Sequence, residues 1–220
     1  MDFNNLKYEQ EKILDKIFDF LYGCALHDAV LQRAFIGKKA WIGELKEPKK
    51  ELRKYIEKVM NKEFENQDDH DKFFIKTANT ICIEINKEKP ADAKDVFSFG
   101  NAQKLINMAV KHVYSFCFYD QGLREAFRYC HCPLDSIMVN EVWDRYGKRF
   151  KKKARKERLH DRSFFCKSWG NEGQEGNTQP VFFEAPDRYK LFQDAIKELT
   201  GEELYPLEFD YLVWKEKKNV

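Results

Sequence analysis

The sequence has no long hydrophobic run, no signal-like start and no regular cysteine pattern. Its apolar runs are shorter than the ~20 residues that a membrane-spanning helix requires, so we expect no membrane contact. Residues 1–5 lack the basic and apolar regions of a signal peptide. The six cysteines are scattered through a lysine-rich chain, a distribution typical of thiols in a core rather than of a disulfide framework. We therefore expect a cytoplasmic protein.

The chain also has no large excess of positive or negative charge. The chain has 39 Lys and Arg against 37 Asp and Glu, and its net charge is only +2. The global charge therefore does not indicate a polyanionic partner, and any basic surface must be local. By contrast, 43% hydrophobic and 15% aromatic residues in 220 are enough to fill a substantial core.

The sequence shows no internal repeat and no alternation of strands with helices, so we expect a mainly α-helical globular domain. Apolar residues recur at three- and four-residue intervals in several segments, which predicts amphipathic helices. The first is expected to break near Gly23 or His27-Asp28, and 37–48 is expected to be a loop anchored by Trp41. The expected helical segments are 6–36, 49–64, 73–85 and 186–200.

A glycine-rich segment separates the expected core domain from the C-terminal part of the chain. Residues 170–180 contain three glycines and no apolar residue, which predicts a flexible surface loop. This loop lacks the Gly-Lys-Ser/Thr ending of a phosphate-binding P-loop. We expect a helical core domain over 1–169, followed by this loop and by a C-terminal helix and tail over 181–220 that pack on the core.

The chain is organised around 95–147, which reads as a helix, a cysteine-rich turn and a second helix. Pro133 fixes the entry to the second helix, Asp135 or Ser136 can cap it, and Gly147 is expected to end it. A carboxylate is thereby placed at a helix N-terminus, where the helix dipole stabilises it as an anion. This position suits a cap, and it equally suits a carboxylate that faces a developing positive charge.

This region resembles the helix-hairpin-helix DNA glycosylase superfamily, especially its 8-oxoguanine branch. The resemblance rests on Val96-Phe-Ser-Phe-Gly100, on the helix through Lys104, and on Cys132-Pro-Leu-Asp135 opening a later helix. It implies a helix-hairpin-helix fold and a DNA repair enzyme, a hydrolase or lyase, that removes a base. No cofactor and no metal are implied.

The resemblance also implies roles for single residues. Backbone N–H groups around Ser98, Gly100 and Asn101 would bind a DNA phosphate, and the target nucleotide would be flipped into a pocket. Asp135 would stabilise positive charge on the sugar as the base leaves. Lys104, if burial lowered its pKa, would attack the sugar carbon and form a Schiff base.

A basic run, 148–162, holds nine of the lysines and arginines and follows the aromatic residues Trp143 and Tyr146. Its composition is typical of a solvated surface and equally of phosphate contacts, with Lys148, Arg149 and Lys152 as the first candidates. DNA is the expected partner, and RNA remains an alternative.

Other chemistries are open as alternatives. Arg155 and His160 fit the arginine-histidine spacing of a HEPN-type ribonuclease. The acidic run 66–71 and the Cys130-His-Cys132 triplet each contain metal-ligand types, but neither has the paired spacing of a zinc site. We expect dipole-favouring residues at a helix start in the first and structural packing in the second. A non-enzymatic helical module that binds nucleic acid or protein is the opposing function.

Overall fold

The computed structural model describes residues 3–30, 39–88, 97–149 and 184–218. Within these ranges it has nine α-helices and no strand, which confirms the mainly α-helical class. None of the helices that lie in the described ranges is long and apolar enough to cross a membrane. Their bounds are α1 Phe3–Val30, α2 Lys39–Glu44, α3 Lys46–Met60, α4 Gln67–Lys87, α5 Phe99–Cys117, α6 Gln121–Arg124, α7 Ser136–Arg149, α10 Glu184–Thr200 and α11 Pro206–Lys218, with a short 3-10 helix at Glu125–Phe127.

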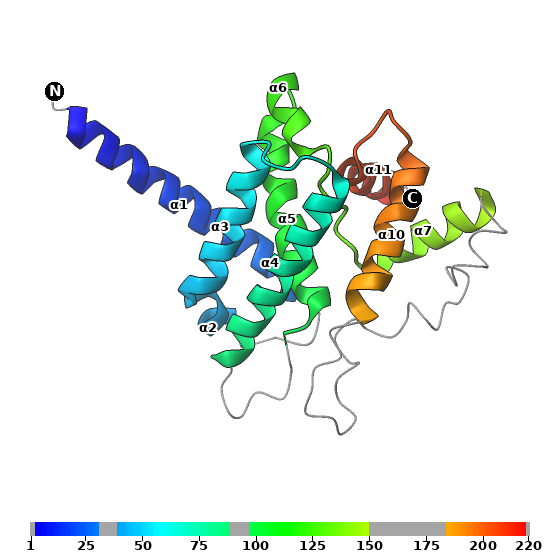
Figure 1. Ribbon diagram of the computed structural model, residues 1–220, viewed down its shortest axis with the longest axis horizontal. Coiled ribbons are helices and arrows are strands. Elements are labelled where there is room, and N and C mark those ends of the chain that lie inside the picture. The colour runs from blue at the N-terminus through cyan, green and yellow to red at the C-terminus, as the bar shows by residue number, and fades with distance from the viewer. Residues whose placement is uncertain (1–2, 31–38, 89–96, 150–183, 219–220) are drawn as a thin grey trace.

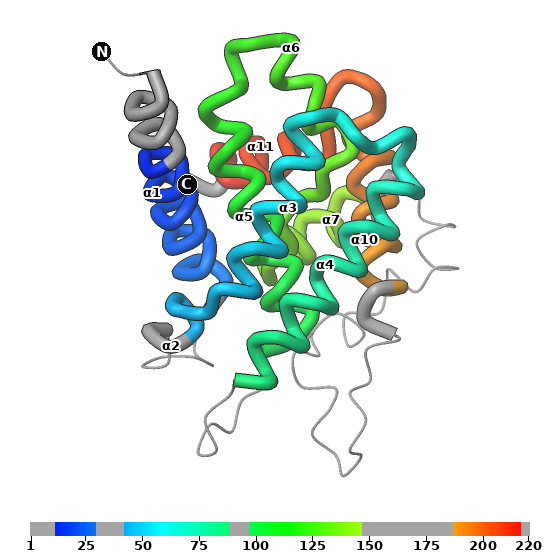
Figure 2. The backbone as a smooth tube through the Cα atoms, turned by 60° about the vertical axis from the view of Figure 1, so that its left-hand side comes forward, coloured from blue at the N-terminus to red at the C-terminus, as the bar shows by residue number. Residues whose placement is uncertain are grey.

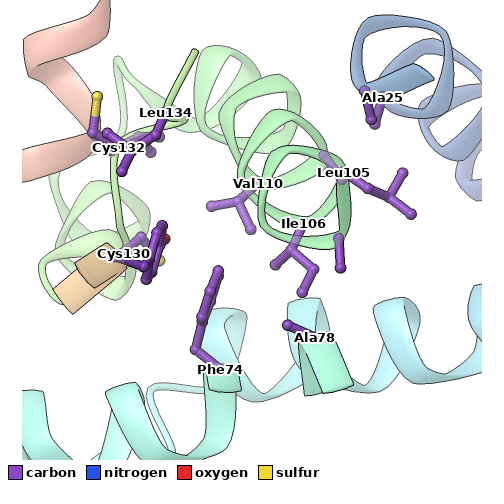
Figure 3. Packing of buried hydrophobic residues seen from close by; sticks show 14 of the residues in the cluster. Ala25, Phe74, Ala78, Leu105, Ile106, Val110, Cys130, Cys132 and Leu134 are labelled. Atoms are coloured by element: carbon purple, nitrogen blue, oxygen red, sulfur yellow. The ribbon is translucent and has the colours of Figure 1, made fainter. Parts of the chain in front are cut away.

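Helix α5 is the centre of the fold. It packs against α1 and α4, and α10 also touches it (Figure 1). Its apolar residues point to different neighbours: Leu105 lies on the side of Ala25 in α1, and Ile106 points toward Ala78 in α4 (Figure 3). A helix that buries side chains on several faces must lie inside the protein rather than on its surface.

The N-terminal helices brace α5 from one side. Helix α1 runs obliquely, and its N-terminal half extends beyond the other helices (Figure 1). Its C-terminal half is buried through Tyr22, Ala25, Leu26 and Ala29. Helix α3 packs on α4 through an apolar stripe that includes Leu52 and Tyr55, while its polar face stays in water.

The C-terminal helices cover the opposite side. Helix α10 packs on α7 and on α11, and α11 also contacts α7 (Figure 2). Gly201 follows α10 with a φ of +65°, a left-handed conformation that glycine adopts without steric cost. This turn returns the chain so that Leu207, Phe209 and Val213 of α11 are buried.

Three local predictions were wrong. Helix α1 continues through Gly23 and His27-Asp28, because Tyr22, Leu26 and Ala29 keep one buried stripe across the predicted break. The predicted loop 37–48 contains helix α2 and the start of α3. Helix α7 runs two residues beyond Gly147 to Arg149, since a single glycine costs a helix only about 1 kcal/mol.

Candidate functional site

The segment 130–135 has no regular secondary structure, is mostly buried, and is held by side-chain amides. The N–H of Cys132 donates to Gln193 Oε1 at 3.0 Å, and Gln193 Nε2 donates to the Cys132 carbonyl at 2.8 Å. Two residues on, the N–H of Leu134 donates to Gln103 Oε1 at 3.2 Å, and Gln103 Nε2 donates to the Leu134 carbonyl at 2.8 Å. Each side-chain amide thus bonds both the N–H and the C=O of one residue, as a backbone residue of an adjacent strand would in a sheet. A buried backbone outside any sheet thereby keeps its hydrogen bonds.

Asn107 connects the two clamps. Its Nδ2 lies 3.2 Å from Gln103 Oε1 and 3.4 Å from the Cys132 carbonyl, and it donates to the Tyr189 hydroxyl at 2.8 Å. Gln103, Asn107 and Gln193 are all at most 4% exposed. Buried amides with several partners fix one arrangement of the chain, since any displacement would leave polar groups unpaired. The segment is therefore tied to α5 and α10 at once.

Asp135 ends this segment and begins α7. Its Oδ1 accepts hydrogen bonds from the N–H groups of Ile137 and Met138, both at 2.9 Å, and its carbonyl accepts from Val139 at 2.9 Å. The prediction that Asp135 or Ser136 caps the helix is confirmed for Asp135. The side chain is half-buried, so the carboxylate is oriented by the helix and is still within reach of solvent.

Lys104 directly follows Gln103 in the chain, and Asp135 directly follows Leu134, the residue to which Gln103 is bonded. The two candidate residues are therefore on adjacent pieces of backbone. Lys104 is half-buried on α5. Successive residues on a helix point about 100° apart, so Lys104 does not share the direction in which Gln103 reaches Leu134.

The predicted phosphate contacts at Ser98, Gly100 and Asn101 form the start of α5. Ser98 caps the helix: its Oγ accepts from the Asn101 N–H, and Asn101 Oδ1 accepts from the Ser98 N–H at 3.1 Å. Asn101 also donates to the Ala29 carbonyl of α1 at 3.2 Å. The capping box uses the N–H groups of Ser98 and Asn101. Phe99 and Gly100 are the first-turn residues whose N–H groups it does not use.

The basic candidates lie at the edge of the described structure. Lys148 and Arg149 end α7, and only their backbone is described. The helix dipole stabilises positive charge at a helix C-terminus. Lys152 lies outside the described residues, as do Arg155 and His160 of the ribonuclease alternative.

A second polar cluster joins two motifs that the sequence separates by 60 residues. His131 Nε2 lies 2.9 Å and His70 Nδ1 3.4 Å from Oδ1 of Asp71. The Tyr55 hydroxyl lies 2.6 Å from His70 Nε2. Asp68 and Asp69 occupy the first turn of α4 as expected, whereas Asp71 is buried in this cluster and not a surface residue at the helix start.

Burial and hydrogen bonding set the charges in this cluster. Burial lowers the pKa of His70 to about 4, so its imidazole is neutral at pH 7. Burial alone would raise the pKa of Asp71, but hydrogen bonds from His131 and His70 outweigh it and hold that pKa well below its usual range. Lys190 Nζ, 3.3 Å from Asp71 Oδ2, supplies a compensating charge. Sequence reasoning missed this cluster because spacing along the chain does not reveal which helix faces which turn.

Apolar side chains are exposed on α1 and near the C-terminal end of α5. Ile13, Leu14 and Phe20 of α1 are 56%, 60% and 68% exposed, and Phe116 of α5 is 79% exposed. A hollow of about 660 Å³ between α1 and α5 is lined by Ile13, Ile17, Phe20 and Phe116 among others. Large contiguous apolar patches on a protein surface mark interaction sites.

Comparison of the chain with protein-family models, with curated proteins and with solved structures finds no match in any of the three.

Proposed function

We propose that the chain is a DNA-binding protein of the helix-hairpin-helix glycosylase type that excises a base. The observation that carries the proposal is the placement of Asp135. It is a half-buried carboxylate at the N-terminus of α7, on a segment that Gln103 fixes to the helix bearing Lys104. A fixed carboxylate is suited to stabilise positive charge, because it needs no reorganisation when that charge appears.

The chemistry follows from this placement. The bond between the base and the sugar carbon breaks, the base leaves with the electron pair, and Asp135 stabilises the positive charge that develops on the sugar. Water, or Nζ of Lys104, then adds to the sugar carbon, and the proton it loses is passed to the solvent. Addition of Lys104 would give an aminal, whose bond between the sugar carbon and the ring oxygen then breaks as that oxygen takes up a proton from solvent. The Schiff base that results would be trapped by borohydride as a stable adduct.

The test uses two variants that separate charge from capping. Asp135→Asn keeps a side chain that caps helices as well as aspartate does but removes the negative charge, whereas Asp135→Ala removes both. We expect duplex DNA containing uracil, 8-oxoguanine or an abasic site to show base release or strand cleavage with the wild type and not with Asp135→Asn. Lys104→Ala should abolish the borohydride adduct while leaving the fold intact.

Three negative results together would refute the glycosylase proposal. If none of these substrates loses a base, no adduct forms and no salt-dependent DNA binding occurs, the glycosylase proposal is wrong. If Asp135→Asn retains full activity, the role proposed for Asp135 is wrong and the residue is only a cap.

A second candidate function is a non-enzymatic binding module, and the exposed apolar hollow between α1 and α5 favours it. In this case the interaction surface would include Ile13, Phe20 and Phe116, none of which contributes to the segment that carries Asp135. Phe20→Ser should then abolish partner binding without affecting any DNA chemistry, whereas Asp135→Asn should have no effect on either.

A further inference from the structure

We infer that His70, Asp71 and His131 form a binding site for one divalent transition-metal ion of the zinc class. Each residue offers one ligand atom, and these three atoms all lie within 4.8 Å of one another. The residues come from α4 and from the segment 130–135, so the ion would bridge two parts of the fold. This inference is independent of the proposed DNA chemistry.

The donor set fits such an ion. Two imidazole nitrogens and a carboxylate oxygen are common ligands of Zn²⁺, at about 2.0–2.2 Å from the metal. In a tetrahedral arrangement the ligand atoms then lie roughly 3.3–3.6 Å apart. His131 Nε2 and His70 Nδ1 lie 2.9 and 3.4 Å from Asp71 Oδ1, and all three ligand atoms lie within 4.8 Å of one another, so the two imidazoles would have to move closer together to bind the ion.

The ligand residues are also withdrawn from solvent. His70 is fully buried, and its Nδ1 faces Asp71 Oδ1 at 3.4 Å. His131 is 4% exposed, and its Nδ1 has no hydrogen-bond partner among the described residues. The ion would bind Nε2, the other ring nitrogen, which lies 2.9 Å from Asp71 Oδ1, so Nδ1 is left without a partner in the described part of the chain, with or without metal.

The side-chain amide of Gln67 lies beside the three ligand groups. Its amide nitrogen lies 2.8 Å from Asp71 Oδ1 and 3.5 Å from His131 Nε2. The same nitrogen donates to the Tyr129 carbonyl at 3.0 Å. A half turn of the amide would bring its carbonyl oxygen toward the ion and would break this hydrogen bond. His70, Asp71 and His131 are buried and Gln67 is half-buried beside them, which favours a structural over a catalytic zinc site. The ion would thus hold the segment that carries Asp135 against α4.

Lys190 distinguishes a metal site from a hydrogen-bond network most clearly. Its ammonium lies 3.3 Å from Asp71 Oδ2 and 3.1 Å from Asp194 Oδ1, and its side chain is 46% exposed. In the metal-bound state this cation competes with the ion, and it can turn to Asp194 instead. Lys190→Ala should therefore strengthen metal binding. If the cluster were only a hydrogen-bond network, the same variant would weaken the protein and leave its metal content unchanged.

The experiment measures metal content and geometry on the full chain. The protein is produced in zinc-supplemented medium, dialysed and analysed for bound zinc. A second sample is unfolded with chelator and refolded with Co²⁺, whose visible absorption is intense when four ligands surround it tetrahedrally. We expect close to one equivalent of zinc and a tetrahedral cobalt spectrum, and we expect Asp71→Asn and His131→Asn to reduce both at least tenfold.

A surface site must be distinguished in the same experiment. His27 and His112 both lie 3.7 Å from Asp28, and they form the control. His27→Ala should leave the bound metal unchanged, and Lys190→Ala should raise the affinity for Co²⁺ at least threefold. The inference is overturned if the wild type holds less than a tenth of an equivalent, if binding is lost in His27→Ala but kept in Asp71→Asn, or if Lys190→Ala leaves the affinity unchanged. Asp71→Asn and Lys190→Ala keep the test valid if His131→Asn fails to fold.

Discussion

Replacement of Gln103 by leucine tests whether the amide clamp holds the segment 130–135. Gln103 is 1% exposed, and its amide is bonded to both backbone groups of Leu134. Leucine has similar volume but no polar atoms, so the N–H and C=O of Leu134 would be left buried without these partners. Each unsatisfied group costs about 1–3 kcal/mol, and the added apolar contact recovers a part of the loss. We expect Gln103→Leu to lower the free energy of unfolding by about 3 kcal/mol.

The assay is equilibrium unfolding in urea, followed by circular dichroism. Lys104→Ala, one residue further along α5, is the matched control, and we expect it to change the free energy of unfolding by less than about 0.5 kcal/mol. The slope of the transition should be equal in both variants if they alter the folded state alone. A loss below about 0.5 kcal/mol for Gln103→Leu would refute the reasoning that the clamp holds the segment.

Other perturbations test the backbone and the charges. Gly23→Ala should raise the free energy of unfolding by about 0.5–1 kcal/mol, because Gly23 lies inside α1 with open space at its Cβ position. Gly201→Ala should lower it by about 1 kcal/mol, because its φ of +65° disfavours side chains; thermal unfolding measures both. Burial lowers the pKa of His112, so the unfolded chain takes up its proton more readily and stability falls as the pH drops below about 6.5. His112→Gln should therefore gain stability relative to the wild type between pH 7 and pH 5, measured by urea unfolding.

The elements of the fold were predictable where the signal is local. The three- and four-residue spacing of apolar residues indicated α3, α4, α5 and α10, and the Pro133-Leu-Asp135 sequence indicated a capped helix start. The extent of α1 was not predictable from Gly23 alone, since tertiary packing against α5 outweighs the small cost of a glycine in a helix.

The candidate site was predictable only in part. Asp135 could be found because a helix cap involves neighbouring residues. The clamp could not, because Gln103 and Leu134 are 31 residues apart and Gln193 and Cys132 are 61 apart. The same holds for Asp71 and His131, whose contact depends on how α4 meets the segment 130–135. Long-range pairs of polar residues leave no periodic pattern in the sequence.

The most direct test of the proposed function is single-turnover base release from damaged duplex DNA by the wild type and by Asp135→Asn, with the free energy of unfolding measured for both. The proposal predicts that Asp135→Asn releases the base about 100-fold more slowly or slower still, because a preorganised charge is lost. The free energies of unfolding should be equal within about 0.5 kcal/mol, because asparagine still caps α7. Equal rates of release, or no release by either protein from any of the substrates, would contradict the claim that Asp135 acts on a sugar from which a base departs.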